Sequence, residues 1–99
     1  MSYKIFFKEE AQQDIIHASA WYEKQQAGLG ENFLEAVLKE TSTLQTHPRA
    51  YPQKYRGTRE IVMKRFPFLI IYRVEELHIF VHSVYHTRQH PNKKMHRFR

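Results

Sequence analysis

Basic and imidazole side chains are concentrated in the second half of the chain, where they could act on a phosphate group. Cleavage of an RNA phosphodiester needs a base for the ribose 2′-hydroxyl, a cation for the charged transition state and an acid for the leaving 5′-oxygen. Histidine can serve as acid or base near neutral pH. The candidate catalytic residues for such a metal-independent endoribonuclease are Lys64, His82, His86 and Arg88.

The same residue types also suit a basic face that binds a partner without breaking a bond. Residues 1–50 carry five Lys/Arg and seven Asp/Glu (net −2), and residues 51–99 carry eleven and three (net +8), which together give the net charge of +6. This asymmetry favours an anionic partner, either nucleic acid or an acidic protein. The candidate target-binding or nucleic-acid-binding residues are Arg59, Lys64, Arg65, Arg73, Arg88, Lys93 and Lys94.

Four histidines with a spacing of four residues resemble a metal-binding pattern, at positions 78, 82, 86 and 90. On a strand this spacing separates neighbours by roughly 13 Å, whereas zinc needs its ligand nitrogens about 2 Å away. The chain has no cysteine, and we find no Gly-rich phosphate loop or nucleophile elbow. We therefore expect no metal site and no cofactor.

The length of 99 residues predicts a single domain over residues 1–99, with a basic tail at 89–99. No apolar run reaches the roughly 18 residues that a membrane span needs, and the N-terminus lacks the apolar core of a signal peptide. We expect a cytoplasmic protein with no membrane contact.

Three β-branched or aromatic-rich runs follow one another at Arg59–Phe66, Phe68–Val74 and Leu77–His86. With turns at 66–67 and 75–76, the alternation separates an apolar core face from a polar face. The core face is predicted to carry Ile61, Met63, Phe68, Ile70, Tyr72, Val74, Leu77, Ile79, Val81 and Tyr85. The polar face is predicted to carry Lys64, Arg73, His78, His82 and His86.

The first half of the chain predicts one strand and two amphipathic helices. The strand is expected at 2–8 and the helices at about 8–26 and 31–46, with a short loop at 28–30 that makes them an antiparallel hairpin. Trp21 is expected to pack in this hairpin. The predicted fold class is α+β with the order β-α-α-β-β-β: a small, mostly antiparallel sheet with the hairpin on one face and the other face open.

Several motifs occur together over nearly the whole chain. They are Ala11…Asp14-Ile15, Trp21-Tyr22, Gly28-Leu29-Gly30…Phe33, Pro48…Tyr51, the run Arg65–Arg73, Val84–Arg88 and His90-Pro91. In this order the chain resembles the RelE/ParE superfamily of toxins from bacterial type II toxin–antitoxin modules. The resemblance implies the fold predicted above and a small acidic antitoxin that covers the basic face of the toxin in a hetero-oligomer.

The superfamily has two branches with different targets. The resemblance implies either ribosome-dependent mRNA cleavage, as in the RelE-like branch, or poisoning of DNA gyrase, as in the ParE-like branch. The nuclease branch typically has an arginine in the middle strand where this chain has Leu69. The run from Phe66 to Tyr72 and the ending His86…Arg88…Pro91 look more ParE-like. Three hypotheses follow: a gyrase-binding toxin, a ribosome-dependent endoribonuclease, and a non-toxic regulatory member.

Overall fold

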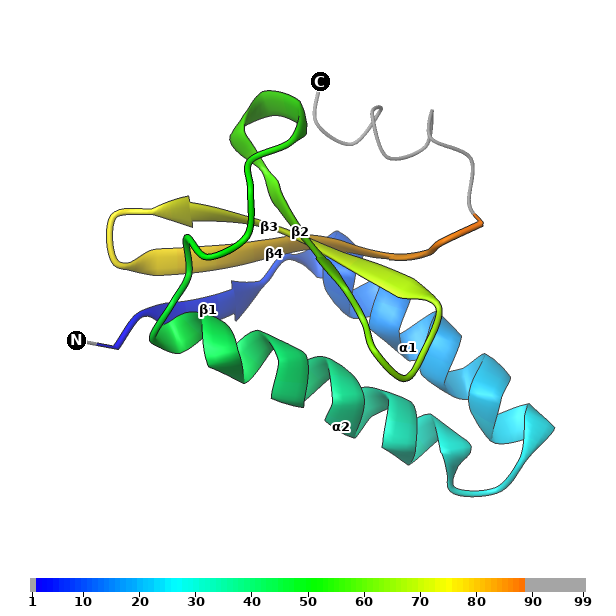
Figure 1. The fold of residues 1–99 in the computed structure, drawn as a ribbon. Coiled ribbons are helices and arrows are strands. Elements are labelled where there is room, and N and C mark those ends of the chain that lie inside the picture. The colour runs from blue at the N-terminus through cyan, green and yellow to red at the C-terminus, as the bar shows by residue number, and fades with distance from the viewer. Residues whose placement is uncertain (1, 89–99) are drawn as a thin grey trace.

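The computed structural model describes residues 2–88, which form a sheet with two helices on one side (Figure 1). The sheet has the order β1-β4-β3-β2; β1 is parallel to β4 and the other pairs are antiparallel. The elements are β1 (Lys4–Phe7), α1 (Glu9–Gln25), α2 (Leu29–Ser42), the 3₁₀ turns η1 (Thr43–Gln45) and η2 (Tyr55–Gly57), β2 (Arg59–Val62), β3 (Phe68–Glu75) and β4 (His78–His86). The predicted fold class and element order are confirmed. No helix in the described part of the chain is long and apolar enough to cross a membrane.

The turn of the helical hairpin is held by one carboxylate. The side chain of Glu23 accepts hydrogen bonds from the backbone N–H groups of Gly28 and Gly30, at 2.9 and 3.0 Å. Gly28 has a φ of 87°, a conformation that a residue without a Cβ adopts readily. A Cβ on Gly30 would lie 2.5 Å from the Ser19 carbonyl oxygen, so glycine is needed here for the close approach of α1 and α2.

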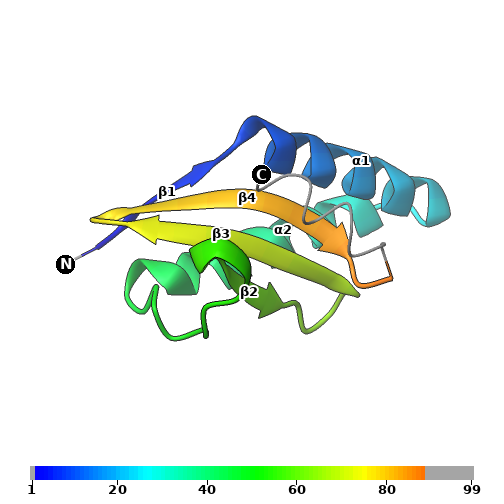
Figure 2. The same cartoon turned by 90° about the horizontal axis from the view of Figure 1, so that it is seen from above.

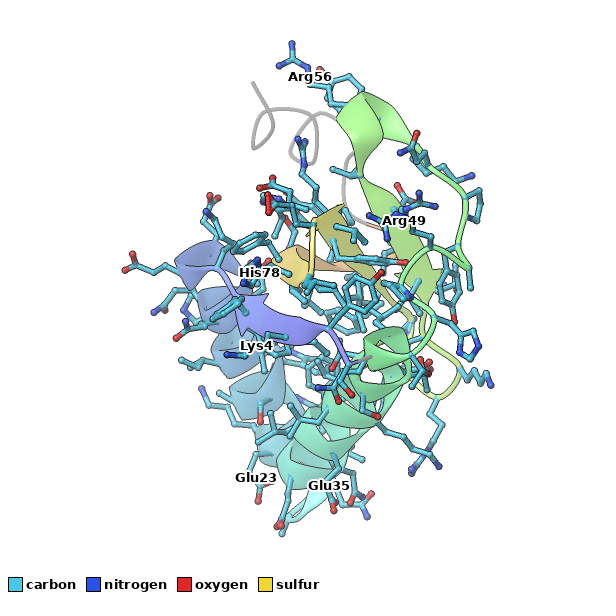
Figure 3. The ribbon with its side chains drawn as sticks, turned by 90° about the vertical axis from the view of Figure 1, so that its left-hand side faces the viewer. Lys4, Glu23, Glu35, Arg49, Arg56 and His78 are labelled. Atoms are coloured by element: carbon cyan, nitrogen blue, oxygen red, sulfur yellow. The ribbon has the colours of Figure 1, made fainter. Side chains whose placement is uncertain are left out.

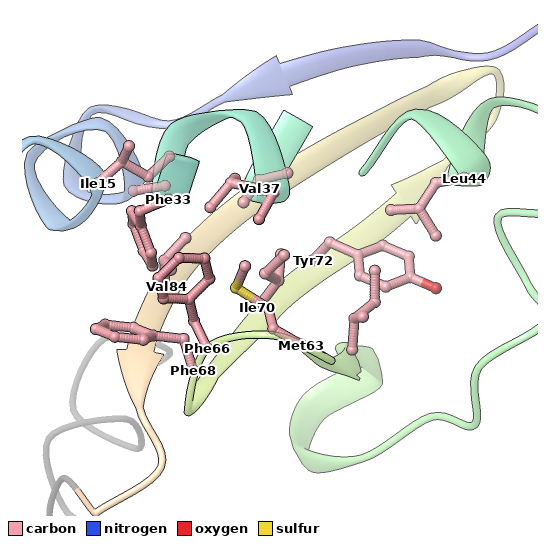
Figure 4. Packing of buried hydrophobic residues seen from close by; sticks show 14 of the residues in the cluster. Ile15, Phe33, Val37, Leu44, Met63, Phe66, Phe68, Ile70, Tyr72 and Val84 are labelled. Atoms are coloured by element: carbon pink, nitrogen blue, oxygen red, sulfur yellow. The ribbon is translucent and has the colours of Figure 1, made fainter. Parts of the chain in front are cut away.

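The core lies between the helices and the sheet (Figure 4). Phe33 of α2 is fully buried against the rings of Tyr22, Phe66 and Phe68, with centroids 4.9 to 5.4 Å apart. Tyr72 is also fully buried; its hydroxyl donates to the Pro48 carbonyl at 2.7 Å. Burial raises the pKa of Tyr72 to about 12, although the charge of Arg59 opposes the shift. Residues predicted for the core face, Ile61, Met63, Phe68, Ile70, Tyr72, Ile79 and Val81, are buried in this cluster.

The turn between β3 and β4 lies one residue later than predicted. Glu75 pairs with His78, so the turn residues are Glu76 and Leu77, and Glu76 adopts a φ of 54°. Leu77 is 46% exposed, so the prediction that it lies in the core was wrong. Moving the turn by one residue shifts the pairing register by two, which leaves the two faces of β3 unchanged. Arg73 consequently pairs with Phe80 rather than with His78.

An irregularity in β4 was not predicted. Tyr72 pairs with Val81 but Ile71 pairs with Ser83, so His82 is an extra residue in β4, as in a β-bulge. The extra residue reverses the sides of all later positions: Val84 joins the core, while Tyr85 packs with Ile71 on the opposite face. The predictions that Tyr85 lies on the core face and His86 on the polar face were therefore wrong.

The face of the sheet opposite the helices, called the outer face below, is not fully open as predicted. The connector between η1 and β2 crosses to that side, and η2 lies over β3 (Figure 2). Tyr55 of η2 packs against Ile71 and Tyr85. The Arg73 guanidinium donates to the Arg56 carbonyl at 2.7 Å and so ties η2 to the sheet. The rest of the outer face is left to β1, β4 and the adjacent end of β3.

Candidate functional site

Arg73 and His82 lie on the outer face, where the bulge places His82. Both side chains are half-buried. Burial lowers the pKa of His82, and the positive charges of Arg73 and Lys8 lower it further, against the opposing charges of Glu75 and Glu10. The lowered pKa favours the neutral form of His82, the form in which an imidazole can accept a proton.

His86 lies on the helix side of the sheet, away from the outer face. It pairs with Phe68, with the two ring centroids 5.2 Å apart. Its Nδ1 accepts a hydrogen bond from the Arg88 backbone N–H at 3.1 Å, which fixes the orientation of the ring. The ring lines a groove of about 530 Å³ between α1 and the end of the sheet, together with Asp14, His17, Ala18, Trp21, Tyr22, Pro67, Phe68 and Val84.

Lys64 and Arg65 occupy a third region, beside α2. The strand β2 ends at Val62, so Lys64 belongs to the loop that follows and not to the polar face predicted for it. The Lys64 backbone N–H donates to the Glu40 carboxylate at 3.1 Å. Both basic residues line a shallow groove with Glu35, Ala36, Lys39, Glu40 and Thr43.

Two further basic candidates differ in their availability to a partner. The guanidinium of Arg59 is on the helix side and donates to the carbonyls of Arg49 and Tyr51, where it holds the connector. The side chain of Arg88 is exposed, just after β4. Lys93 and Lys94, with the rest of the predicted tail, lie outside the described residues. The structure thus places Lys64, His82 and His86 in three separate regions.

Asp14 is a positioning residue that the sequence reading did not assign. Its carboxylate accepts a hydrogen bond from the Val84 backbone N–H at 2.9 Å, at the part of β4 beyond the end of its pairing with β1. Because Val84 lies two residues after His82, just beyond the bulge, this contact fixes α1 against the segment that carries His86. Only the fold brings the two residues, 70 positions apart, together.

Trp21 was expected to pack in the helical hairpin, but its side chain is 57% exposed. Its ring contacts Tyr22 edge to face, with ring centroids 5.1 Å apart. Trp21 also lines the same groove as His86. An exposed tryptophan in an amphipathic helix shows no distinguishing signal in the sequence, because it falls next to the apolar stripe.

The outer face also carries an aromatic cluster that the sequence reading did not single out. Phe6 and Phe80 stack with centroids 5.6 Å apart, and His78 lies 5.7 Å from Phe6. The Lys8 ammonium lies 5.9 Å from the centre of the Phe80 ring. Figure 3 shows Lys4 and His78 at the same end of the sheet, well separated from Arg56. The alternation of Lys4, Phe6 and Lys8 was the only sequence signal for this cluster.

Within residues 2–88 no three His, Asp or Glu side chains come together in a way that could hold a metal ion. The spread of the histidines over the sheet explains this: His78 and His82 lie on the outer face, and His86 on the helix side.

Residues 5–91 match the model of the ParE toxin of the type II toxin–antitoxin system parDE. The chain therefore belongs to the ParE toxin family, within the RelE/ParE superfamily that the sequence motifs indicate. No curated protein sequence matches it.

Several solved structures share the fold of this chain. A chain of the chromosomal ParDE system from P. aeruginosa aligns with a TM-score of 0.73 and 18% identity, covering 86% of this chain and 96% of that chain. A chain of the toxin–antitoxin complex RelBE2 from Mycobacterium tuberculosis aligns with a TM-score of 0.61 and 17% identity, over 87% and 99%. A mutant of the E. coli toxin RelE in the free state gives 0.59 and 22%, over 89% and 86%.

Proposed function

We propose that this ParE-family toxin inhibits bacterial growth by binding an essential cytoplasmic target, DNA gyrase, without cleaving a bond. The observation that carries the proposal is the separation of the candidate catalytic residues. Lys64 lies beside α2, His82 on the outer face and His86 on the helix side. General acid–base catalysis requires its groups within hydrogen-bond reach of one substrate, which this arrangement does not favour. Leu69 in β3 supplies no cation to compensate.

We further propose a small acidic antitoxin as the partner that neutralises the toxin. The net charge of +6 favours association with an acidic chain. Large apolar side chains are also exposed along a groove between β1 and the two helices, among them Ile16, Leu34 and Leu38. Such exposed apolar patches mark protein-interaction sites. The structures with a similar fold from P. aeruginosa and M. tuberculosis are described as parts of toxin–antitoxin systems, which supports the same role here.

The first experiment is inducible expression in a bacterial host, with replication and translation followed by pulse labelling. Gyrase binding predicts a fall in DNA synthesis, induction of the DNA-damage response and intact mRNA. The variants Lys64→Ala and His86→Ala should remain toxic, because gyrase binding involves no catalytic step that these side chains could serve. A fall in translation with mRNA cut at codon positions, abolished by these variants, would contradict the proposal. Normal growth would favour the third hypothesis, a non-toxic regulatory member.

The ribosome-dependent endoribonuclease remains the second candidate, and one observation favours it. His82 is half-buried and its pKa is lowered by burial and by the charges of Arg73 and Lys8. A neutral imidazole next to a guanidinium combines a base with a cation for the phosphorane. The endoribonuclease hypothesis predicts that His82→Gln abolishes mRNA cleavage. Gyrase binding predicts that neither the unmodified chain nor the His82→Gln variant cleaves mRNA.

A further inference from the structure

The aromatic cluster on the outer face has the composition of a nucleobase-stacking surface. Phe6 of β1 and Phe80 of β4 are paired across the parallel ladder, and their rings are stacked with an interplanar angle of 23°. His78 lies against both, with centroids 5.7 and 6.2 Å away. Phe6 is 44% exposed and His78 is exposed, so the cluster is not covered by the rest of the described chain.

Cations flank these rings on both sides. Lys4 pairs with His78 at one end of β1, and Lys8 follows the other end, with its ammonium 5.9 Å from the centre of the Phe80 ring. Both lysine side chains are exposed. Across the sheet, Arg73 pairs directly with Phe80. Along β1 the outer face therefore presents a cation, a ring and a second cation in succession.

The ring cluster is separate from the hydrophobic core. Phe6 and Phe80 lie on the face opposite the main core, and neither belongs to the two buried clusters. Proteins that bind single-stranded nucleic acid combine aromatic rings, on which bases stack, with cations that follow the phosphates. The acidic neighbours are Glu75, which pairs with His78, and Glu10 of α1. Glu75 is the last residue of β3 and Glu10 is in the first turn of α1, so these two acidic residues lie at the two ends of the row formed by Lys4, Phe6 and Lys8.

We propose that the surface formed by Lys4, Phe6, Lys8, His78 and Phe80, called the stacking platform, binds single-stranded nucleic acid. A base stacks on Phe6 and Phe80, and the flanking phosphates contact Lys4 and Lys8. The platform does not include Lys64 or His86, and it binds without cleaving the strand. Its activity is separate from gyrase binding, so either can fail without the other.

The test is fluorescence anisotropy of the full-length chain with labelled ten-residue oligothymidylate and oligouridylate, at low and at moderate salt. Phe6→Leu and Phe80→Leu should each weaken binding by about tenfold, because stacking on an aromatic ring contributes on the order of tenfold or more per base. Lys4→Gln and Lys8→Gln should each lower the slope of log affinity against log salt by about 0.7. The preferred oligonucleotide shows whether DNA or RNA is the better ligand.

Two matched controls separate the platform from other rings and charges. Trp21→Leu removes an exposed ring on the helix side, and Lys39→Gln removes an exposed charge on α2; neither should change the affinity by more than about twofold. Absence of binding, equal loss in Trp21→Leu, or tighter binding of duplex than of single strands would overturn the proposal.

A second measurement does not depend on the folding of any variant. Oligouridylate carrying 5-iodouridine is irradiated with the unmodified chain, and the crosslinked peptide is mapped by mass spectrometry. Crosslinks within Lys4–Lys8 or His78–Phe80 are expected. Crosslinks confined to other segments would overturn the proposal even if the oligonucleotide binds.

Discussion

The two faces of the sheet are built from similar residue types but differ in how much of their apolar surface is buried. The helix side buries one continuous cluster, in which Phe33, Ile70, Tyr72 and Val81 are all fully inaccessible to solvent. The outer face has only a small buried cluster of Ile71 and Tyr85, covered by Tyr55 of a single turn. The comparison indicates that the helix side carries most of the stability, while the outer face can keep rings and cations exposed for binding.

The bulge at His82 decides which residues belong to each face. Without it, Tyr85 would continue the core and His86 would point outward on the same face as His82. With it, Val84 enters the core and His86 contacts Phe68 on the helix side. One additional residue in a strand therefore puts on opposite faces two histidines that regular alternation would place on the same face.

The largest effect is expected for Phe33→Ala on the helix side. The change removes a fully buried ring that touches three other rings, so the free energy of unfolding should fall by about 3–5 kcal/mol. Urea denaturation followed by circular dichroism measures this loss. Tyr55→Ala, which opens the small cluster of the outer face, should cost clearly less, because Tyr55 is only partly buried. Equal losses would refute the assignment of stability to the helix side.

A smaller loss is expected for Gly30→Ala in the helical hairpin. The new Cβ would approach the Ser19 carbonyl oxygen to 2.5 Å, so the helices must move apart, at a cost of about 1–3 kcal/mol. Gly28→Ala is the matched control: no atom lies within 4 Å of its Cβ position, and only its φ of 87° is unfavourable. It should cost about 1 kcal/mol. Thermal unfolding of the two variants compares them directly; a larger loss for Gly28→Ala would contradict the close helix contact.

Asp14→Ala tests the link between α1 and the segment after the bulge. The variant removes the acceptor of the Val84 N–H, a hydrogen bond to a carboxylate, and should lower stability by about 1–3 kcal/mol. The diagnostic result is local: hydrogen exchange of the Val84 amide should accelerate more than that of Ile61, which lies in β2. Gln12→Ala, on the same helix as Asp14, serves as the control: it removes an exposed side-chain hydrogen bond to the backbone carbonyl of Phe7 in β1. Uniform acceleration of both amides would mean that Asp14 acts only on global stability.

The element order and most of the buried residues on the helix side of the sheet could be predicted from the sequence. Alternation in 59–74 assigns Ile61, Ile70 and Tyr72 to the core even though the turn is misplaced, because the β2–β3 register differs from the predicted one by two residues, which keeps the same faces. Helical periodicity and the glycines at 28 and 30 likewise specify the hairpin.

The candidate site could not be predicted to the same extent, for three physical reasons. The bulge leaves no local signal in the run from Phe80 to Tyr85, and part of what fixes it is Asp14, distant in sequence. Lys64 lies outside β2 because its backbone N–H bonds to Glu40 of α2. The connector, which has no apolar period, nevertheless covers part of the outer face through Tyr55 and the contact between Arg73 and Arg56.

The smallest effect is expected from the pH dependence that His82 gives to the outer face. Burial, Arg73 and Lys8 lower its pKa below the ordinary value of 6.5, so the folded state binds a proton less readily than the unfolded chain. Stability from this group is complete above pH 6.5 and decreases as the pH falls through that value toward the lower pKa of the folded protein. Arg73→Gln should bring the pKa of His82 part of the way back, as measured by NMR titration of the imidazole. His82→Gln should flatten the fall in melting temperature between about pH 7 and pH 5.5. An unchanged pH profile in that variant would mean that the acid sensitivity of the fold comes from groups other than His82.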